Sequence, residues 1–187
     1  MRKSIKFEYA IVVVLGFIAL QGCALQNELD ADGGLGTVSA IQAVNLMSSA
    51  VGLDPNQLST VYDEVKYSYT GLLSPAAIQA HINLAGFVMA KLIEREIALP
   101  EAQRVIFEGI SLSGGWRTVT DANVETLANR LSFRVNGELP SPETIAVLVE
   151  TFNSMKSGYQ NNNTTQQRDL FKAIGALILG QAGTLLG

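Results

Sequence analysis

Residues 74–97 read SPAAIQAHINLAGFVMAKLIEREI, and this stretch decides the fold. Ser74 and Pro75 are typical of a helix start, because serine caps free backbone N–H groups and proline in the first turn has no N–H to leave unpaired. Apolar residues follow at helical spacing and also occupy most positions between, so the helix is apolar nearly all round. Such a helix is typical of the buried centre of a domain. Its apolar positions are Ile78, Ile82, Leu84, Ala85, Phe87, Val88, Met89, Leu92 and Ile93.

Similar start and stop signals recur on both sides of this segment. Asp54-Pro55 and Ser141-Pro142 repeat the pattern of a capping residue followed by proline, and Gly52 suits a helix end. Asn136-Gly137 suits either a left-handed helix C-cap or a hairpin turn, and the helical period before it favours the cap. Further helices are expected near residues 37–51, 54–69, 100–107, 120–136, 141–152 and 165–186.

Residues 109–120, with the sequence GISLSGGWRTVT, break the helical period. The serine-rich alternation around Gly114-Gly115 is compatible with a short β-hairpin near residues 110–120, and a loop between two helices fits equally well. The sequence as a whole predicts an all-α fold, namely a single compact domain of about six to seven helices.

The first 22 residues have the three parts of a secretory signal. Arg2, Lys3 and Lys6 give a positive start, and residues 10–20 form an uncharged apolar run of eleven residues. As a helix this run spans only ~16 Å, about half of the hydrocarbon core of a bilayer. The run is therefore too short for a transmembrane anchor and predicts a cleaved signal peptide.

The string Leu20-Gln21-Gly22-Cys23 ends this run and resembles the lipobox of bacterial lipoproteins. The resemblance implies cleavage before Cys23 and lipidation of Cys23, with palmitate as a typical acyl chain. Cys23 is the only cysteine, so it has no disulfide partner within the chain. In lipoproteins an aspartate after the cysteine favours the inner membrane; Ala24 stands there instead, which implies the outer membrane, on its periplasmic face. Cleavage after Ala24, which would release the domain, stays open as the alternative.

These features divide the chain into three parts: a lipoprotein signal peptide over residues 1–22, the lipidated cysteine and a flexible tether over 23–36, and a helical domain over 37–187. The tether, with the sequence ALQNELDADGGLG after the cysteine, is polar, acidic and then rich in glycine. Loss of the signal peptide changes the formal net charge from −4 to about −6. This charge disfavours nucleic acids and anionic lipid surfaces as partners.

Two short segments resemble parts of other exported proteins. Residues 130–143, RLSFRVNGELPSPE, are similar to a helix-turn-helix junction in helical domains of planctomycete-type, cytochrome-associated exported proteins. Residues 176–183, ALILGQAG, are similar to the end of helical modules in uncharacterised LamG-associated bacterial proteins. Neither segment carries a catalytic residue, so the resemblance implies only an exported helical module.

The sequence lacks the common catalytic signatures, and we expect neither an enzyme nor a cofactor or metal ion. His81 is the only histidine and lies on an apolar helical stripe, which favours a core histidine over a catalytic one. The carboxylate pairs Asp63/Glu64 and Glu94/Glu96 do not share a helix face, so we interpret them as solvated residues. No second histidine or free cysteine is available to complete a metal site.

Two groups of residues are candidates for binding a partner. Trp116 and Arg117 follow Gly114-Gly115 in the least regular segment, and both residue types are enriched at binding hot spots. A tryptophan folded back into the core is the equal alternative. Tyr62, Lys66 and Tyr69 share one helical face, which is either a recognition surface or, as we prefer, a half-buried amphipathic stripe.

The sequence therefore predicts an outer-membrane-anchored periplasmic lipoprotein that acts as a structural adaptor or assembly factor of an envelope complex. Its expected partners are the membrane, through the lipid anchor, and a protein of the cell envelope, not nucleic acid. The alternative is a periplasmic module that binds a lipid or another apolar ligand, because the apolar central helix and the Gly/Ala-rich final helix could line a cavity.

Overall fold

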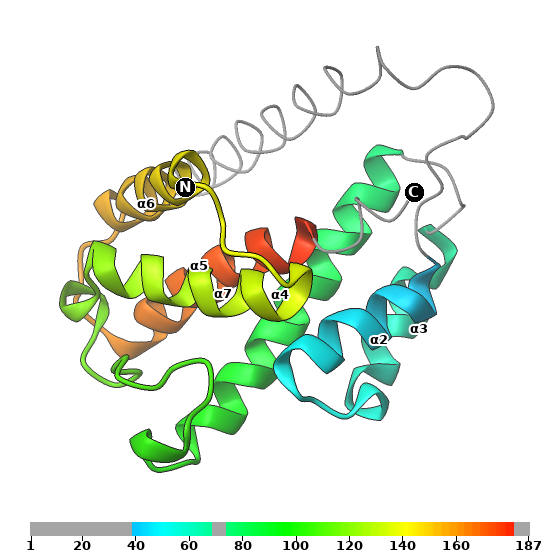
Figure 1. Cartoon of the computed structure of the whole chain (residues 1–187), viewed down its shortest axis with the longest axis horizontal. Coiled ribbons are helices and arrows are strands. Elements are labelled where there is room, and N and C mark those ends of the chain that lie inside the picture. Colours follow the sequence, from blue (N-terminus) through cyan, green and yellow to red (C-terminus); the bar gives the residue numbers. More distant parts are fainter. Residues whose placement is uncertain (1–38, 69–73, 182–187) are drawn as a thin grey trace.

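Helix α4 (Pro75–Ile97) runs through the middle of the molecule in the computed structural model, which describes residues 39–68 and 74–181 (Figure 1). The side chain of Ser74 caps the helix by accepting a hydrogen bond from the backbone N–H of Ala77, at 3.1 Å. Leu84, Val88 and Met89 have no solvent exposure at all. The prediction of a central, buried helix is therefore confirmed.

Helix α4 is also the one helix, within residues 39–68 and 74–181, that is long and apolar enough to cross a membrane. Half of its apolar window is buried inside the protein, and helices α2, α3 and α7 pack against it. Burial by neighbouring helices thus accounts for much of its apolar character.

The all-α prediction is confirmed, since the described residues contain six α-helices and no β-strand. Helices α2 and α3 (blue to cyan in Figure 1) pack against α4, and α2 also reaches α5. Helix α7 lies along α4 and contacts α5, while α6 packs on α5 and α7 at the outside. Beside α4, the helices are α2 (Ala40–Val51), α3 (Ser59–Val65), α5 (Asp121–Asn136), α6 (Pro142–Ser157) and α7 (Thr164–Gln181).

The predicted start and stop signals lie at the helix ends. Asp54 caps a 3-10 helix over Pro55–Leu58 that leads into α3, and Ser141 caps α6. Gly52 and Gly137 end α2 and α5 in the left-handed conformation, with φ of 68° and 74°. Asn136-Gly137 is therefore a helix C-cap, as its preceding period predicts. The part of the expected last helix after residue 181 lies outside the described residues.

Helices α4 and α7 approach closely where a glycine faces a methionine. A Cβ atom added to Gly175 would overlap the side chain of Met89, which is completely buried. At Gly180 an added Cβ would instead lie at an ordinary contact distance of 3.7 Å from Ile82. The small residues of α7 thus allow the close approach of the two helices that their sequence predicts.

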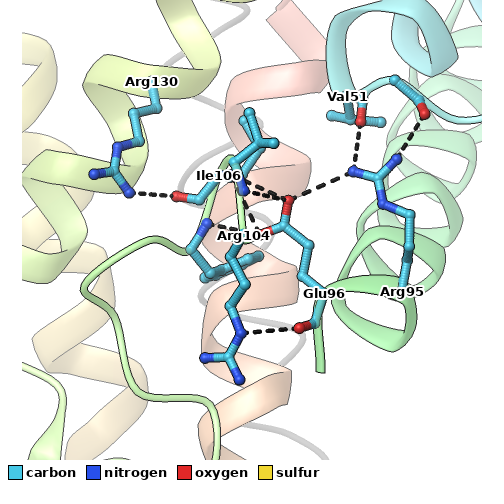
Figure 2. A network of polar contacts seen from close by, with 9 residues as sticks. Val51, Arg95, Glu96, Arg104, Ile106 and Arg130 are labelled. Atoms are coloured by element: carbon cyan, nitrogen blue, oxygen red, sulfur yellow. Dashed lines mark hydrogen bonds and ion pairs between the residues drawn. The ribbon is translucent and has the colours of Figure 1, made fainter. Parts of the chain in front are cut away.

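The helix expected over residues 100–107 does not form, and this prediction is wrong. Only Glu101–Gln103 makes a short 3-10 helix, and the chain that follows is irregular. The cause is Glu96, whose completely buried carboxylate accepts hydrogen bonds from three consecutive backbone N–H groups (Figure 2). The donors are Val105 at 3.2 Å, Ile106 at 3.1 and 3.2 Å, and Phe107 at 2.8 Å. These N–H groups are therefore not available for helical hydrogen bonds.

Arg95 adds further polar contacts beside the Glu96 carboxylate. Arg95, beside Glu96, donates to the backbone oxygens of Val51 at 2.8 Å and Gly52 at 2.6 Å. It therefore binds the C-terminus of α2, where a positive charge is favourable. The same guanidinium lies 3.5 Å from the Glu96 carboxylate, so one contact region joins α2, the end of α4 and the following loop (Figure 2).

Two further arginines, Arg104 and Arg130, connect the irregular segment after Gln103 to the neighbouring helices. Arg104 donates from Nε to the backbone oxygen of Glu96 at 2.9 Å. Arg130, from α5, donates to the backbone oxygens of Ile106 at 2.8 Å and Glu108 at 2.6 Å. The loop is thus connected by polar contacts to both α4 and α5 (Figure 2).

The segment 110–120 is a loop, so the β-hairpin alternative is wrong. Its only regular element is a 3-10 helix over Trp116–Thr118. Ile110, Leu112 and Val119 are buried in the core, which holds both ends of the loop inward. The backbone oxygen of Ser111 accepts a hydrogen bond from the buried Gln167 of α7 at 2.7 Å, in place of a cross-strand partner.

We expect Glu96→Gln to lower the free energy of unfolding by about 3 kcal/mol, because the amide replaces one accepting oxygen with a donor that faces backbone N–H groups. Urea unfolding followed by circular dichroism measures this change. Glu94→Gln is the matched control: its carboxylate is 66% exposed and pairs with Lys91, so its loss costs less than about 1 kcal/mol. Equal effects of the two variants would contradict the assigned role of Glu96.

Candidate functional site

Trp116 lies where the 110–120 loop meets the loop between α6 and α7. Its indole ring is half-buried and packs against the hydrophobic core. The indole N–H donates to the backbone oxygen of Asn161 at 2.8 Å, and the ring lies 6.3 Å from that of Tyr159. The only tryptophan of the chain thus joins two loops that are 45 residues apart in sequence.

Gly115 makes a close approach between the same two loops possible. Its φ of +79° lies in the left-handed region, which glycine adopts without strain. A Cβ atom there would come within 2.5 Å of the Asn162 side chain, whose oxygen accepts a hydrogen bond from the backbone N–H of Arg117 at 2.9 Å. We call this group the Trp116 clasp; it consists of Gly115, Trp116, Arg117, Tyr159, Asn161 and Asn162.

Two cations lie beside the Trp116 ring. The guanidinium carbon of Arg117 is 5.3 Å from the ring centroid, and the Lys156 ammonium is 5.8 Å from it. Lys156 also lies 5.1 Å from the Phe152 ring and donates to the backbone oxygen of Val119 at 3.0 Å. Both cations are within the distance at which an aromatic ring attracts positive charge.

Neither cation forms an ion pair with a carboxylate of the residues that the structure describes. Burial raises the pKa of the Tyr159 hydroxyl, and the negative charge of Asp169 raises it further. Asp121 accepts a hydrogen bond from the Asn153 side chain at 3.1 Å. The arrangement offers positive charge and aromatic surface, which are suited to binding.

Trp116 and Arg117 are adjacent in the chain, but their side chains differ in solvent exposure. The indole is packed against the core, as the core alternative predicts, whereas the guanidinium of Arg117 is exposed. Their role in binding stays a prediction.

Of the second candidate group (Tyr62, Lys66 and Tyr69), the structure describes Tyr62 and Lys66. Lys66 lies 5.7 Å from the Tyr62 ring and pairs with Asp63 at 2.7 Å, and the hydrogen bond to Asp63 raises the pKa of Lys66. Tyr67, which a regular helix would place off this face, lies 5.1 Å from Lys66, because α3 gives way to a 3-10 helix over Lys66–Ser68. Tyr69 lies outside the described residues.

His81 is buried in α4, as predicted. Burial lowers the pKa of its imidazole to about 4, so the ring is neutral near pH 7. Among residues 39–68 and 74–181, no three histidine, cysteine or acidic side chains are grouped so that they could hold a metal ion.

Sequence reasoning missed several residues that the structure brings together. No motif in the sequence marks Lys156, and Tyr159, Asn161 and Asn162 belong to a segment with the pattern of a polar, low-complexity loop. The three consecutive asparagines at 161–163 are the sequence signal that could have indicated these loop contacts, because asparagine side chains often bond to backbone N–H groups in turns and caps. The interpretation of Glu96 as solvated is wrong, whereas Glu94 is indeed exposed.

Direct contact between Met89 and Gly175 fills the space between α4 and α7 at that point. The alternative of an apolar ligand held between these helices therefore gains no support there. Cys23 and the tether lie outside the described residues.

Comparison with protein-family models, with curated proteins and with solved structures finds no match to this chain.

We expect Gly115→Ala to open the Trp116 clasp, because its Cβ displaces Asn162. Fluorescence measures this directly, since Trp116 is the only tryptophan: the emission shifts to the red and iodide quenching increases. Gly109→Ala is the matched control, with φ of +70° and no atom within 4 Å of the added Cβ. Unchanged emission in Gly115→Ala would show that the clasp does not depend on this approach.

We expect the protein to lose stability as the pH falls from about 6.5 to about 4. The unfolded imidazole of His81 takes up a proton near pH 6.5, whereas burial lowers the pKa of the folded imidazole to about 4. Between these values the unfolded state binds more protons, so the free energy of unfolding falls by up to about 3 kcal/mol. Urea unfolding at several pH values measures this, and His81→Gln should show a shallower pH dependence; equal slopes would contradict it.

Proposed function

We propose that this chain is a lipid-anchored adaptor or assembly factor of an envelope complex, with Cys23 as its lipidated residue and the helical domain as its partner-binding part. The observation that carries the proposal is the Trp116 clasp, in which loop contacts hold an exposed arginine beside a half-buried tryptophan. A surface held in this way loses little conformational freedom on binding, which favours affinity.

The surroundings of the titratable groups support a binding role. His81 is buried and neutral, and Glu96 is taken up by backbone hydrogen bonds. Within the described residues the clasp is thus a place where residue types enriched at binding hot spots combine with solvent exposure, as the exposed Tyr67 also does.

The proposed anchor accounts for the layout of the chain. The cysteine precedes a polar segment of 13 residues, 24–36, which reaches at most ~45 Å when extended. Such a tether would let the helical domain reach partners near the periplasmic face of the outer membrane.

Metabolic labelling with palmitate tests the anchor. The mature protein should incorporate the label and partition into the membrane fraction, and Cys23→Ser should lose both properties. A mature N-terminus at residue 25, which follows cleavage after Ala24, would contradict the anchored form.

Cross-linking before solubilisation in detergent, followed by affinity capture, tests the adaptor role. One envelope protein should be recovered reproducibly, and Arg117→Ala should lower its yield several-fold by removing an exposed cation. Phe133→Ala is the control, because its side chain is 60% exposed and lies near the far end of α5 from Trp116. Recovery of the protein alone under several cross-linking conditions would contradict the adaptor role.

A further inference from the structure

Among the residues that the structure describes, the two cations of the Trp116 clasp region lack an acidic partner. Arg117 and Lys156 lie 5.3 and 5.8 Å from the centroid of one ring, so their charges are at most about 11 Å apart. Neither forms an ion pair with a carboxylate of residues 39–68 or 74–181, whereas Lys66, Lys91, Arg95 and Arg130 each do.

This positive site belongs to a chain whose formal net charge is −4. Two cations near each other repel, and the aromatic ring offsets only part of that repulsion. An incoming anion that contacts both charges would gain attraction from each. The site is thus complementary to a negatively charged group.

We propose that the partner docks an acidic segment of its own chain on the Trp116 clasp, with carboxylates that pair with Arg117 and Lys156. This inference rests on the proposed adaptor function and adds the chemistry of the partner. In an extended segment, side chains two or three positions apart are separated by roughly 7–10 Å, which lies within the upper limit of about 11 Å between the two cations. The segment therefore carries acidic residues at that spacing.

The number of charges favours a protein segment over a membrane or a nucleic acid. Recognition of anionic lipid by electrostatics takes clusters of about 4–8 basic residues, and the clasp region presents two. A whole anionic surface is also repelled by the net negative charge of the chain, whereas a short segment meets mainly the local positive charge.

Of the two cations, Arg117 is exposed and Lys156 is half-buried. The acidic segment therefore approaches from the side of the exposed Arg117.

Site-specific photocross-linking of the full-length protein in its own cells tests this proposal. Benzoylphenylalanine replaces Ser113, Gln160 or Phe133 in turn; all three are exposed, and the first two lie in the loops that form the clasp. Phe133 lies on α5, 12 residues beyond the start of that helix and therefore ~18 Å along it. Mass spectrometry then identifies the cross-linked peptide, and each position is combined with Arg117→Glu, Arg117→Lys or Arg134→Glu.

The expected result has three parts. Positions 113 and 160 cross-link one protein, and the captured peptide contains acidic residues two or three positions apart. Arg117→Glu lowers the yield at least about tenfold, because repulsion replaces attraction. Arg117→Lys retains most of the yield, and Arg134→Glu, a charge reversal at another exposed arginine, leaves it unchanged.

Three results would overturn the proposal. A captured peptide without acidic residues, cross-linking mainly to lipid, or equal effects of Arg117→Glu and Arg134→Glu would each exclude an acidic segment at this site. A protein captured only from position 133 would overturn the assigned site while the adaptor function stands. No protein captured from any of the three positions would overturn the adaptor function together with this inference.

Discussion

The buried carboxylate of Glu96 is the contact on which the rest of the structure depends. It accepts hydrogen bonds from the backbone of Val105, Ile106 and Phe107, and so holds the chain that follows α4 against the end of that helix. A buried charge is tolerated only where hydrogen bonds replace water, and three backbone donors provide this replacement. Ile106 and Phe107 are thereby held in the core, and Phe107 packs edge-on against Phe171 of α7 with ring centroids 5.3 Å apart.

The proposed binding surface depends on the same turn. Once Glu96 holds residues 105–107, the next stretch runs between buried Ile110 and Val119. Gln167 binds the backbone of this stretch from α7, and Asn162 binds it at the N–H of Arg117. Trp116 begins a 3-10 helix of only three residues, and contacts that start at the core hold that short helix in place. This explains how an irregular loop presents side chains in a defined arrangement.

Much of the fold could be predicted because its signals are local. Ser74-Pro75, Ser141-Pro142 and Gly137 act on backbone groups within a few residues, and the structure shows them at helix ends. The failures involve distant contacts. Residues 100–107 have helical spacing, but Glu96 takes up their N–H groups, and no pattern within that segment reveals it. At the candidate site, Trp116 and Arg117 could be selected by residue type, whereas Lys156 and Asn162 join them only through the packing of α6 and α7.

Helix α6 is the least anchored helix around the clasp. Leu148 and Phe152 are its only fully buried side chains, and it packs on α5 and α7 at the outside of the molecule. Helices with few buried contacts open locally at lower free energy than the core around them. Lys156 belongs to α6, and Tyr159 follows directly after it, so such an opening would remove both from Trp116. Local unfolding of one outer helix would therefore remove one cation and one aromatic neighbour from Trp116 while α4 and its core stay folded.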